Sequence, residues 1–366
     1  MQYYMPTRMF LGSGCVKENA SMLSEIGKHA LIVTGAHSAR VSGALEDVLA
    51  ALQTAGCLWT LFDQVTANPT IDCAYAGAHM ACAAGADFVL AIGGGSPMDA
   101  GKAIALLAKN PQLTPQTLFA GSYPGGALPI VCIPTTAGTG SEVTKASILT
   151  NDAAKTKSSI ANELLFPKVA FLDGKYTEEL PLRTTIHTAV DALSHAAEGM
   201  LSCKACVITD ALAKESLGRI GACFSSLQKG SLSPQQRQSL LAASTEAGMV
   251  IANTGTTAVH AMGYSLTYFK HIDHGRANGL LFADFLEFVC KKSPQRVQQV
   301  LSALGCTSVA QLRGVLSALL GKPEPLSEKE AEQFAAIAIR SKNIENCLVK
   351  PTQQDLLHIY RAGFSL

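Results

Sequence analysis

The sequence lacks any apolar run that approaches the roughly 20 residues a membrane-spanning helix needs. It also lacks runs of like charge, because 29 Lys and Arg side chains and 28 Asp and Glu side chains, a net charge of +1, are spread along the chain. A surface for nucleic acid or for an anionic membrane normally needs clustered basic residues. We therefore expect no nucleic-acid partner and no membrane partner, and a small molecule as the ligand.

The cysteine pattern excludes a disulfide framework. The 11 cysteines, from Cys15 to Cys347, are scattered among apolar residues, and the chain opens MQYYMPTRMF, without an apolar signal segment. Both features favour a reducing, cytoplasmic location. Cys203 and Cys206 form a CxxC, a redox or zinc pattern, but no second CxxC accompanies it. We interpret the pair as two half-buried helix-end cysteines, with a redox role as the alternative.

The length and the distribution of apolar residues predict two domains. A chain of 366 residues exceeds what one hydrophobic core usually organises. Residues 1–176 alternate short β-branched runs with amphipathic stretches, the pattern of a parallel sheet covered by helices on both faces. From residue 177 to residue 366 apolar residues recur at helical spacing instead. The expected fold class is an N-terminal α/β dinucleotide-binding domain with a Rossmann-like parallel sheet over 1–176, followed by an all-helical domain over 177–366.

The same patterns locate the elements. The expected strands are at 30–34, 58–62, 88–92, 129–133 and 169–172. The expected helices are at 38–54, 70–84 and 98–109 in the first domain, and at 208–227, 238–251, 276–289, 296–304, 309–320, 328–340 and 353–361 in the second.

Residues 188–198, read TAVDALSHAAE, place a carboxylate and an imidazole four residues apart in an Ala-rich, helix-favouring run. On a helix, Asp191 and His195 share one face. Such a pair can hold a divalent metal, or it can form an ordinary hydrogen bond on a helix surface.

Two more histidines strengthen the metal interpretation. His260 and His274 lie downstream, each in a stretch that offers little other reason for an imidazole. With the Asp and His of residues 188–198 they would form a mixed nitrogen and oxygen site that suits Fe²⁺, Zn²⁺, Ni²⁺ or Mn²⁺. His271 and Asp273 compete for these roles, and spacing does not exclude them.

The run GGGSPMDAGK, residues 93–102, follows an expected strand and opens an expected helix. Ser96 suits an N-cap, Pro97 the first helical position, and Asp99 the capping-box position. Three successive glycines let a ligand approach the backbone amides, and a helix N-terminus favours an anion such as a pyrophosphate. The run is not the GxGxxG of the usual dinucleotide fingerprint. A turn capped for stability alone would explain the Ser and Pro but not the three glycines.

A second loop, PTTAGTGSEVT at residues 134–144, also follows an expected strand. Its dense hydroxyls and glycines can hold a phosphate or a ribose, although a polar surface loop is the alternative. Ligands of open α/β sheets bind at the carboxyl ends of the strands, which favours a functional role.

As an ordered set, these motifs resemble the iron-containing alcohol dehydrogenases, the group III family. The resemblance runs nearly end to end through MPT, FLGSG, GGGSPMDAGK, PTTAGTGSEVT, VDALSHAAE, GTTAVHAMG and HGRANG. It implies an α/β dinucleotide domain and a helical domain that binds the metal and the substrate. The implied activity is metal-dependent, NAD(P)-linked hydride transfer between nicotinamide C4 and a short primary alcohol or aldehyde, with the metal as Lewis acid.

The resemblance also implies residue roles. The metal, Fe²⁺ ahead of Zn²⁺ or Ni²⁺, would be held by Asp191, His195, His260 and His274. The implied coenzyme contacts are Gly94, Gly95, Ser96, Asp99, Thr135, Thr136, Thr139 and Lys157, together with Asn68 and Thr177.

The expected proton relay departs from the family pattern. Many members carry a second histidine four residues after the third ligand, often proposed to move the proton, but Tyr264 stands at that position here. Tyr264, His271 or a chain of water molecules would take over this step. We favour water, because a neutral tyrosine is a poor base near neutral pH.

The residues expected to set the coenzyme preference also depart from the pattern of NAD-preferring family members. NAD-preferring members often carry an Asp at the position of Gly35, where it binds the ribose hydroxyls. Gly35 and Ser38 are expected to contact the coenzyme here, and Arg40 supplies a donor. We therefore favour NADP(H) over NAD(H).

Three alternatives stay open. Dehydroquinate synthases share the two-domain plan but are expected to use a Glu with two histidines, and glycerol dehydrogenases use three ligands instead of four. The third alternative is a non-catalytic module that keeps the nucleotide-binding fold but has lost the catalytic activity. The small number of aromatic residues hints at a short aliphatic alcohol or aldehyde. A homodimer is an open alternative to a monomer.

Overall fold

The computed structural model describes residues 2–153 and 156–366, which form two compact units. One is an α/β unit of residues 5–179, and the other is a helical unit that consists of residues 180–366 together with residues 2–4. The division falls between residues 179 and 180, not at the expected 176 and 177. Tyr4 belongs to the helical unit because its backbone N–H donates to Asn253 Oδ1 at 2.8 Å, a contact that no sequence pattern indicated.

A six-stranded parallel sheet in the order β1-β8-β5-β4-β2-β3 forms the centre of the α/β unit. Its strands are β1 (Arg8–Leu11), β2 (His29–Val33), β3 (Leu58–Phe62), β4 (Phe88–Gly93), β5 (Ile130–Pro134) and β8 (Val169–Leu172). The five expected strands are confirmed. The sequence did not indicate β1 or the separate antiparallel hairpin of β6 (Ala146–Asn151) and β7 (Thr156–Ala161), because β1 is a short edge strand and β7 is mostly polar.

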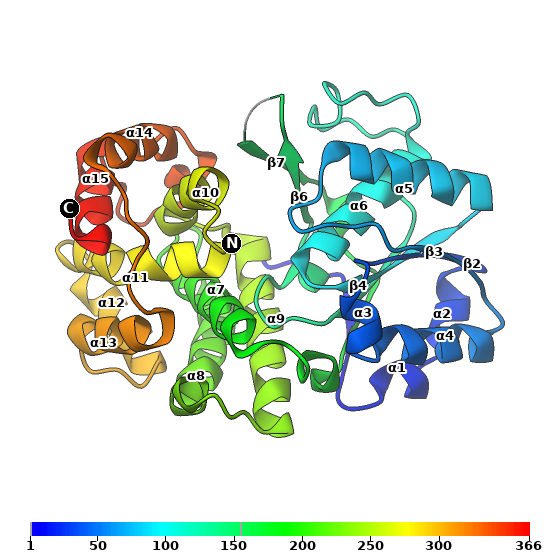
Figure 1. Ribbon diagram of the computed structural model, residues 1–366, viewed down its shortest axis with the longest axis horizontal. Helices are drawn as coiled ribbons and strands as arrows, with labels where there is room; N and C mark the ends of the chain where they lie inside the picture. Colours follow the sequence, from blue (N-terminus) through cyan, green and yellow to red (C-terminus); the bar gives the residue numbers. More distant parts are fainter. Residues whose placement is uncertain (1, 154–155) are drawn as a thin grey trace. The chain divides into compact units, whose positions relative to one another are not determined.

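Helices cover both faces of this sheet (Figure 1). Alternate residues of each strand enter different cores, as Leu31 and Val33 pack with α5 and α6 while Ala30 and Ile32 pack with α4. The helices of the unit are α1 (Cys15–Glu18), α2 (Ser21–Ile26), α3 (Ser38–Val41), α4 (Ala44–Ala55), α5 (Ile71–Ala84) and α6 (Gly95–Lys109). The single helix expected at 38–54 is therefore two helices, since Gly43 between them has a φ of 75°.

The helical unit contains every helix that the sequence predicted there, with ends shifted by a few residues. The helices of the unit are α7 (Leu182–Met200), α8 (Val207–Lys229), α9 (Pro234–Thr254), α10 (Ala258–Lys270), α11 (His274–Cys290), α12 (Pro294–Ala303), α13 (Val309–Leu320), α14 (Glu328–Ala338) and α15 (Gln353–Phe364), of which α10 was not among the expected ranges. Helix α7 packs against α8, α9 and α11, and it is buried along most of its length. Its polar side chains are therefore held in the interior of the unit.

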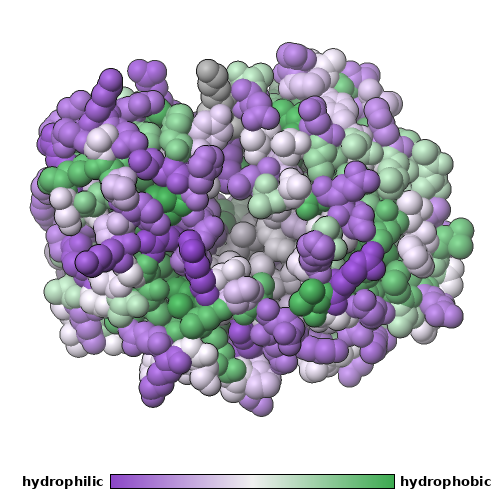
Figure 2. All heavy atoms as spheres, in the orientation of Figure 1, coloured by the Kyte–Doolittle hydropathy of each residue, from purple (hydrophilic) through white to green (hydrophobic). Residues whose placement is uncertain are grey.

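No helix in the described part of the chain is long and apolar enough to cross a membrane. On the face drawn in Figure 2, hydrophilic residues are spread over the surface and are not gathered into one area, as the dispersed charges of the sequence predict.

Candidate active site

Helix α7 carries Asp191, His195 and Glu198 on one buried face, because residues three and four apart lie one above another on a helix. Two glycines on neighbouring helices allow close packing beside them. A Cβ on Gly275 would lie 1.9 Å from His187 O, and a Cβ on Gly263 would lie 2.1 Å from Asn278 Oδ1. Larger residues at these two positions would force the helices apart.

The structure brings three of the four expected metal ligands into one group. The ligand atoms of Asp191, His195 and His260 all lie within 4.8 Å of one another, and all three side chains are buried. The rings of His195 and His260 stack with centroids 4.5 Å apart. His274 lies at the edge of this group, with Nε2 3.9 Å from Asp191 Oδ1 and a side chain that is 27% exposed.

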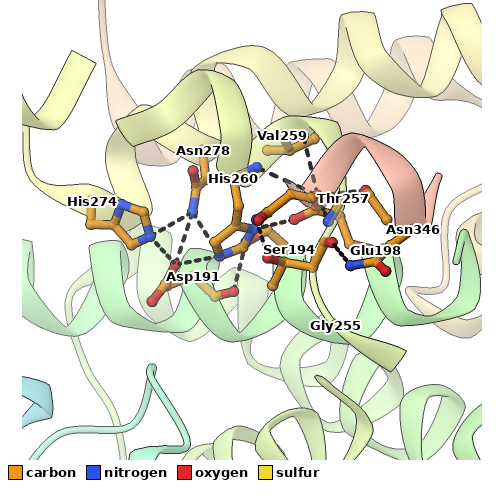
Figure 3. A network of polar contacts seen from close by, with 12 residues as sticks. Asp191, Ser194, Glu198, Gly255, Thr257, Val259, His260, His274, Asn278 and Asn346 are labelled. Carbon is orange, nitrogen blue, oxygen red and sulfur yellow. Dashed lines mark hydrogen bonds and ion pairs between the residues drawn. The ribbon is translucent and has the colours of Figure 1, made fainter. Parts of the chain in front are cut away.

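Asn278, which sequence reasoning quoted only within HGRANG, lies at the centre of the cluster (Figure 3). Its Nδ2 group donates to Asp191 Oδ1 at 3.0 Å and faces Nε2 of His260 at 3.2 Å and Nε2 of His274 at 3.4 Å. Three possible metal-ligand atoms thus converge on one amide nitrogen. A cation requires the same convergence of donor atoms.

Glu198 is the second residue that sequence reasoning missed. Its Oε2 accepts a short hydrogen bond from His260 Nδ1, and its Oε1 accepts from the backbone N–H of Thr257 at 2.8 Å and from Thr257 Oγ1 at 2.6 Å (Figure 3). A proton held on Nδ1 leaves the Nε2 lone pair of His260 free to face Asp191. This carboxylate–histidine pairing is typical of metal-binding histidines. The helical spacing of Glu198 from His195 is the signal that could have found it.

The buried charges of the cluster stabilise one another. Burial raises the pKa of Asp191, but the charges of His195, His274 and His260 and the Asn278 hydrogen bond more than offset it, so the pKa lies below its ordinary value. Burial likewise opposes ionisation of Glu198, yet contacts to His260 hold the Glu198 pKa below its usual range. Both carboxylates are therefore anionic near neutral pH, which suits a divalent cation.

Tyr264 and His271, the two candidate relay residues, have different surroundings. The ring of Tyr264 stacks on the ring of His274, with centroids 5.5 Å apart and planes at 8°, and it meets His260 edge-on. His271 is exposed at the end of α10, where its φ of 54° closes the helix in the left-handed region. Tyr264 therefore lies in the cluster, whereas His271 shapes the turn that follows α10.

Asp273 supports α7 instead of joining the metal group. Its Oδ2 lies 2.8 Å from His187 Nδ1 and 3.5 Å from Arg183 Nη2. His187 lies on α7, one helical turn before Asp191. This contact ties the start of α11, and hence His274, to α7.

In the α/β unit, the helix start expected at Ser96 is wrong. Helix α6 begins at Gly95 with Gly94 as the N-cap, and no side chain caps its first turn. Ser96 Oγ instead accepts a hydrogen bond from the backbone N–H of Asn68 at 3.1 Å, and Asn68 has a φ of 56°. A helix N-terminus without a side-chain cap keeps backbone donors available for an anion.

The two glycine-rich loops lie against each other at this helix start. A Cβ on Gly94 would lie 3.0 Å from Thr136 Oγ1, and a Cβ on Gly95 would lie 2.9 Å from Thr139 Cγ2. The glycines therefore permit close approach of the second loop to the first. Thr135 Oγ1 is buried and has no hydrogen-bond partner within the described residues, so it can accept one from a ligand.

A buried lysine fixes the second loop. Lys102 is fully buried, and its Nζ donates to Ser141 O at 2.6 Å, Ser141 Oγ at 2.8 Å, Thr144 Oγ1 at 3.2 Å and Ala146 O at 3.0 Å. Asp99, expected in a capping box, instead accepts from Ser141 Oγ at 2.8 Å. Burial lowers the pKa of Lys102 and raises that of Asp99, and each charge partly offsets the shift of the other.

The remaining expected coenzyme residues are spread over other elements of the α/β unit. Lys157 lies in β7, and its charge lowers the pKa of Asp99 against the effect of burial. Thr177 Oγ1 is buried and donates to Gly174 O at 2.8 Å. Gly35 follows β2 and Ser38 opens α3, and a Cβ on Gly35 would lie 3.0 Å from Val65 O.

Comparison with known proteins assigns this two-domain architecture to a class of metal-containing dehydrogenases. Residues 6–174 match the family described as "Iron-containing alcohol dehydrogenase", and residues 185–364 match "Fe-containing alcohol dehydrogenase family, C-terminal". The chain belongs to the iron-containing alcohol dehydrogenase family. It is thus an oxidoreductase acting on alcohols, and the family implies a metal and an NAD(P) coenzyme.

Individual relatives agree with this assignment. The chain is 32% identical to "Probable alcohol dehydrogenase EutG" of Escherichia coli over 82% of this chain and 76% of that protein. The solved iron-containing alcohol dehydrogenase of Thermotoga maritima is 36% identical, with a TM-score of 0.93 over 100% of this chain and 99% of that chain. The sulfoacetaldehyde reductase of Bifidobacterium kashiwanohense, solved with NAD⁺, is 29% identical, with a TM-score of 0.88 over 100% and 98% of the chains.

Proposed function

We propose that this oxidoreductase exchanges a hydride between nicotinamide C4 of NADP(H) and a short primary alcohol or its aldehyde. The proposed metal ligands are Asp191, His195, His260 and His274. The observation that carries the proposal is the convergence of Asp191 Oδ1 and the Nε2 atoms of His260 and His274 on the Asn278 amide.

The donor set fits a divalent transition metal. One carboxylate and neutral imidazoles suit Fe²⁺, Zn²⁺ or Ni²⁺, and they leave the site one negative charge for a doubly charged ion. Glu198 supports this fit because it fixes the tautomer of His260. Fe²⁺ is the proposed native metal because the family is iron-containing.

When bound, the metal supplies Lewis acidity toward the alcohol or carbonyl oxygen, and the coenzyme supplies the carbon that exchanges the hydride. Glu198 keeps the proton on His260 Nδ1, while Asp273 and Gly275 keep α11 against α7. Tyr264 holds the ring of His274 by stacking. Because a neutral tyrosine is a poor base, we assign proton movement to water.

The coenzyme is proposed to bind the uncapped start of α6 with its pyrophosphate, between Gly94, Gly95 and Ser96 on one side and Thr135, Thr136 and Thr139 on the other. Asn68, Lys157 and Thr177 would complete the binding region. We propose that Asp99 supports the second loop, since both of its oxygens already accept hydrogen bonds.

NADP(H) is favoured because the chain after β2 offers no carboxylate at Gly35 and supplies Arg40, whose Nη2 lies 3.5 Å from Asp63 Oδ2 on the surface. The relatives include enzymes named for either coenzyme. A NADPH-dependent butanol dehydrogenase of Clostridium saccharobutylicum is 28% identical to this chain, and a NAD-dependent methanol dehydrogenase of Bacillus methanolicus is 30% identical.

A pair of substitutions tests the coenzyme proposal. Gly35→Asp should lower kcat/KM for NADPH about 10-fold or more relative to NADH, because a carboxylate repels the 2′-phosphate. Gly35→Asn introduces the same bulk beside Val65 O without the charge, and it should change both coenzymes alike. An unaltered enzyme that prefers NADH manyfold would contradict the preference.

The central experiment is metal analysis of protein purified without oxygen, combined with assays in which each metal is restored. We expect about one Fe²⁺ per chain, and alcohol oxidation and aldehyde reduction that disappear with a chelator and return with Fe²⁺. Full activity of metal-free protein would contradict the proposal. A homodimer and a cytoplasmic location stay predictions, which light scattering and cell fractionation can test.

A further inference from the structure

The CxxC turn, left unused by the proposed chemistry, lies between the end of α7 and the start of α8. Cys203 is exposed and Cys206 is half-buried, so the expectation of two half-buried thiols is wrong for Cys203. Both thiols line a surface cavity of about 720 Å³. Reagents in solution can therefore reach this pair of cysteines.

Cys206 has the surroundings of a reactive thiol. It is the N-cap of α8, a helix of 23 residues, and its sulfur accepts from the backbone of Thr209 and lies 3.6 Å from Thr209 Oγ1. The Thr209 backbone and hydroxyl groups hold the pKa of Cys206 below its ordinary value. A thiolate is the nucleophilic form of cysteine, and donors at a helix N-terminus stabilise it.

The buried cysteines have the opposite surroundings. Burial raises the pKa of Cys15 to about 12 and that of Cys347 to about 12. Burial also raises the pKa of Cys132 to about 12. These three thiols are shielded and protonated near neutral pH, so they should not compete with the turn for a reagent.

The cavity suits a small anionic reagent better than another protein surface. Lys214 lines it and is exposed, whereas Arg296 is already bound to Asp210 and to Met200 O. Lys214 in the lining and the exposed Lys204 between the two cysteines can therefore attract a carboxylate-bearing disulfide.

We propose that Cys203 and Cys206 form a redox-active dithiol that low-molecular-weight disulfides oxidise. The Cys206 thiolate attacks one sulfur of the reagent RSSR, forming a Cys206–SR mixed disulfide and releasing RS⁻. Cys203, after losing its proton to solvent, attacks Cys206 Sγ, forms the Cys203–Cys206 disulfide and releases a second RS⁻. Two protein thiols are oxidised while one RSSR is reduced to two thiols.

The turn is tied to the candidate metal centre. Ser202 Oγ donates to Thr254 O at 3.0 Å, and Cys203 N donates to Asn346 O at 2.8 Å. Asn346 in turn donates to Thr256 O at 2.9 Å, beside the Thr257 groups that hold Glu198. Disulfide closure removes the thiol proton of Cys203, so the hydrogen bond from Cys203 Sγ to Glu345 O is lost. The oxidised turn should therefore loosen the support of His260, an inference that rests on the proposed function.

The test uses the whole enzyme, glutathione disulfide and peptide mass mapping. In the wild type we expect a Cys203–Cys206 disulfide that dithiothreitol reverses. Cys203→Ser should stop at a glutathione adduct on Cys206, and Cys206→Ser should leave the turn unreacted. Cys347→Ala is the control, because Cys347 is a buried neighbour that the reaction does not need. No product at the turn, or a Cys203–Cys347 disulfide in its place, would overturn the proposal.

Metal retention tests the coupling separately. The oxidised wild type should lose metal to a chelator several-fold faster than the reduced enzyme, and Cys206→Ser should lose it at one rate under both conditions. Equal rates in the wild type would refute the coupling. If the reduced enzyme holds no metal at all, the proposed function fails. The mass mapping would still show whether Cys203 and Cys206 form a redox-active dithiol.

Discussion

The metal cluster and the coenzyme loops are built in opposite ways. In the helical unit, Asp191, His260 and Glu198 are buried, and each is held by a side-chain partner. In the α/β unit, the start of α6 has no side-chain cap, and the supporting contacts of Lys102 lie beneath the loop. A compact ion needs preorganised ligands, whereas a large anionic coenzyme can use backbone donors that are left available.

The largest effect should follow from removing a proposed ligand. His260→Ala should abolish tight metal binding and reduce kcat/KM by about a thousandfold or more, because it removes one donor and leaves Glu198 without its partner. Coenzyme binding should persist. Metal analysis checks the loss of metal, and fluorescence titration with NADPH checks that coenzyme binding persists. His358→Ala, an exposed histidine on α15, is the control that should keep its metal. A metal-free yet active His260→Ala enzyme would refute the assignment.

The next effect concerns the carboxylate behind the ligand. Glu198→Gln keeps the size of the side chain but removes the charge that holds the proton on His260 Nδ1. We expect metal affinity to fall about 10- to 100-fold. Competition with a chromogenic chelator measures this change. Glu332→Gln, on the exposed face of α14, should leave the affinity unaltered. Equal affinities for both variants would show that Glu198 has no influence on the metal.

A substitution in the α/β unit should weaken coenzyme binding instead of metal binding. Lys102→Met removes the donor to Ser141 and Thr144 and leaves Asp99 with only the weaker effect of the Lys157 charge, so we expect a stability loss of about 3–5 kcal/mol. NADPH affinity should fall while metal affinity stays. Chemical unfolding and both titrations test this, with Lys109→Met on the exposed end of α6 as control. Loss of metal without loss of coenzyme affinity would contradict the separate roles proposed for the two regions.

The smallest expected effect lies outside both regions, at Glu246 on α9. Burial raises its pKa to about 7 from 4.5, although Arg219 Nε lies 3.2 Å from its Oε1. Because the folded pKa is the higher one, this group favours folding most below about pH 4.5 and loses that contribution as the pH rises through about 7.

Glu246→Gln should therefore stabilise the protein by about 1–3 kcal/mol near pH 8, and the gain should shrink as the pH falls through about 7. Unfolding midpoints measured across this range test the sign. Glu215→Gln, at an exposed partner of the same arginine, leaves Glu246 ionisable and should keep the loss of stability as the pH rises. A gain that grows toward acid pH would contradict the assignment.

Periodicities that neighbouring residues share were enough to predict the two-part architecture, five of the six strands of the parallel sheet and the helical pairing of Asp191 with His195. The sequence also indicated both glycine-rich loops, since glycine and hydroxyl residues act through local backbone geometry. It did not find β1, which is short and pairs with the distant β8, or the β6–β7 hairpin, in which β7 is mostly polar.

Only the tertiary structure decided which polar groups meet. Glu198 and His260 are 62 residues apart, and Lys102 and Ser141 are 39 apart, so no local pattern links them. Ser96 suited an N-cap locally, yet its hydroxyl accepts from Asn68 across the loop, and Asp99 turns to Ser141. Burial makes an unpaired polar group costly, and the whole packed interior determines where each finds its partner.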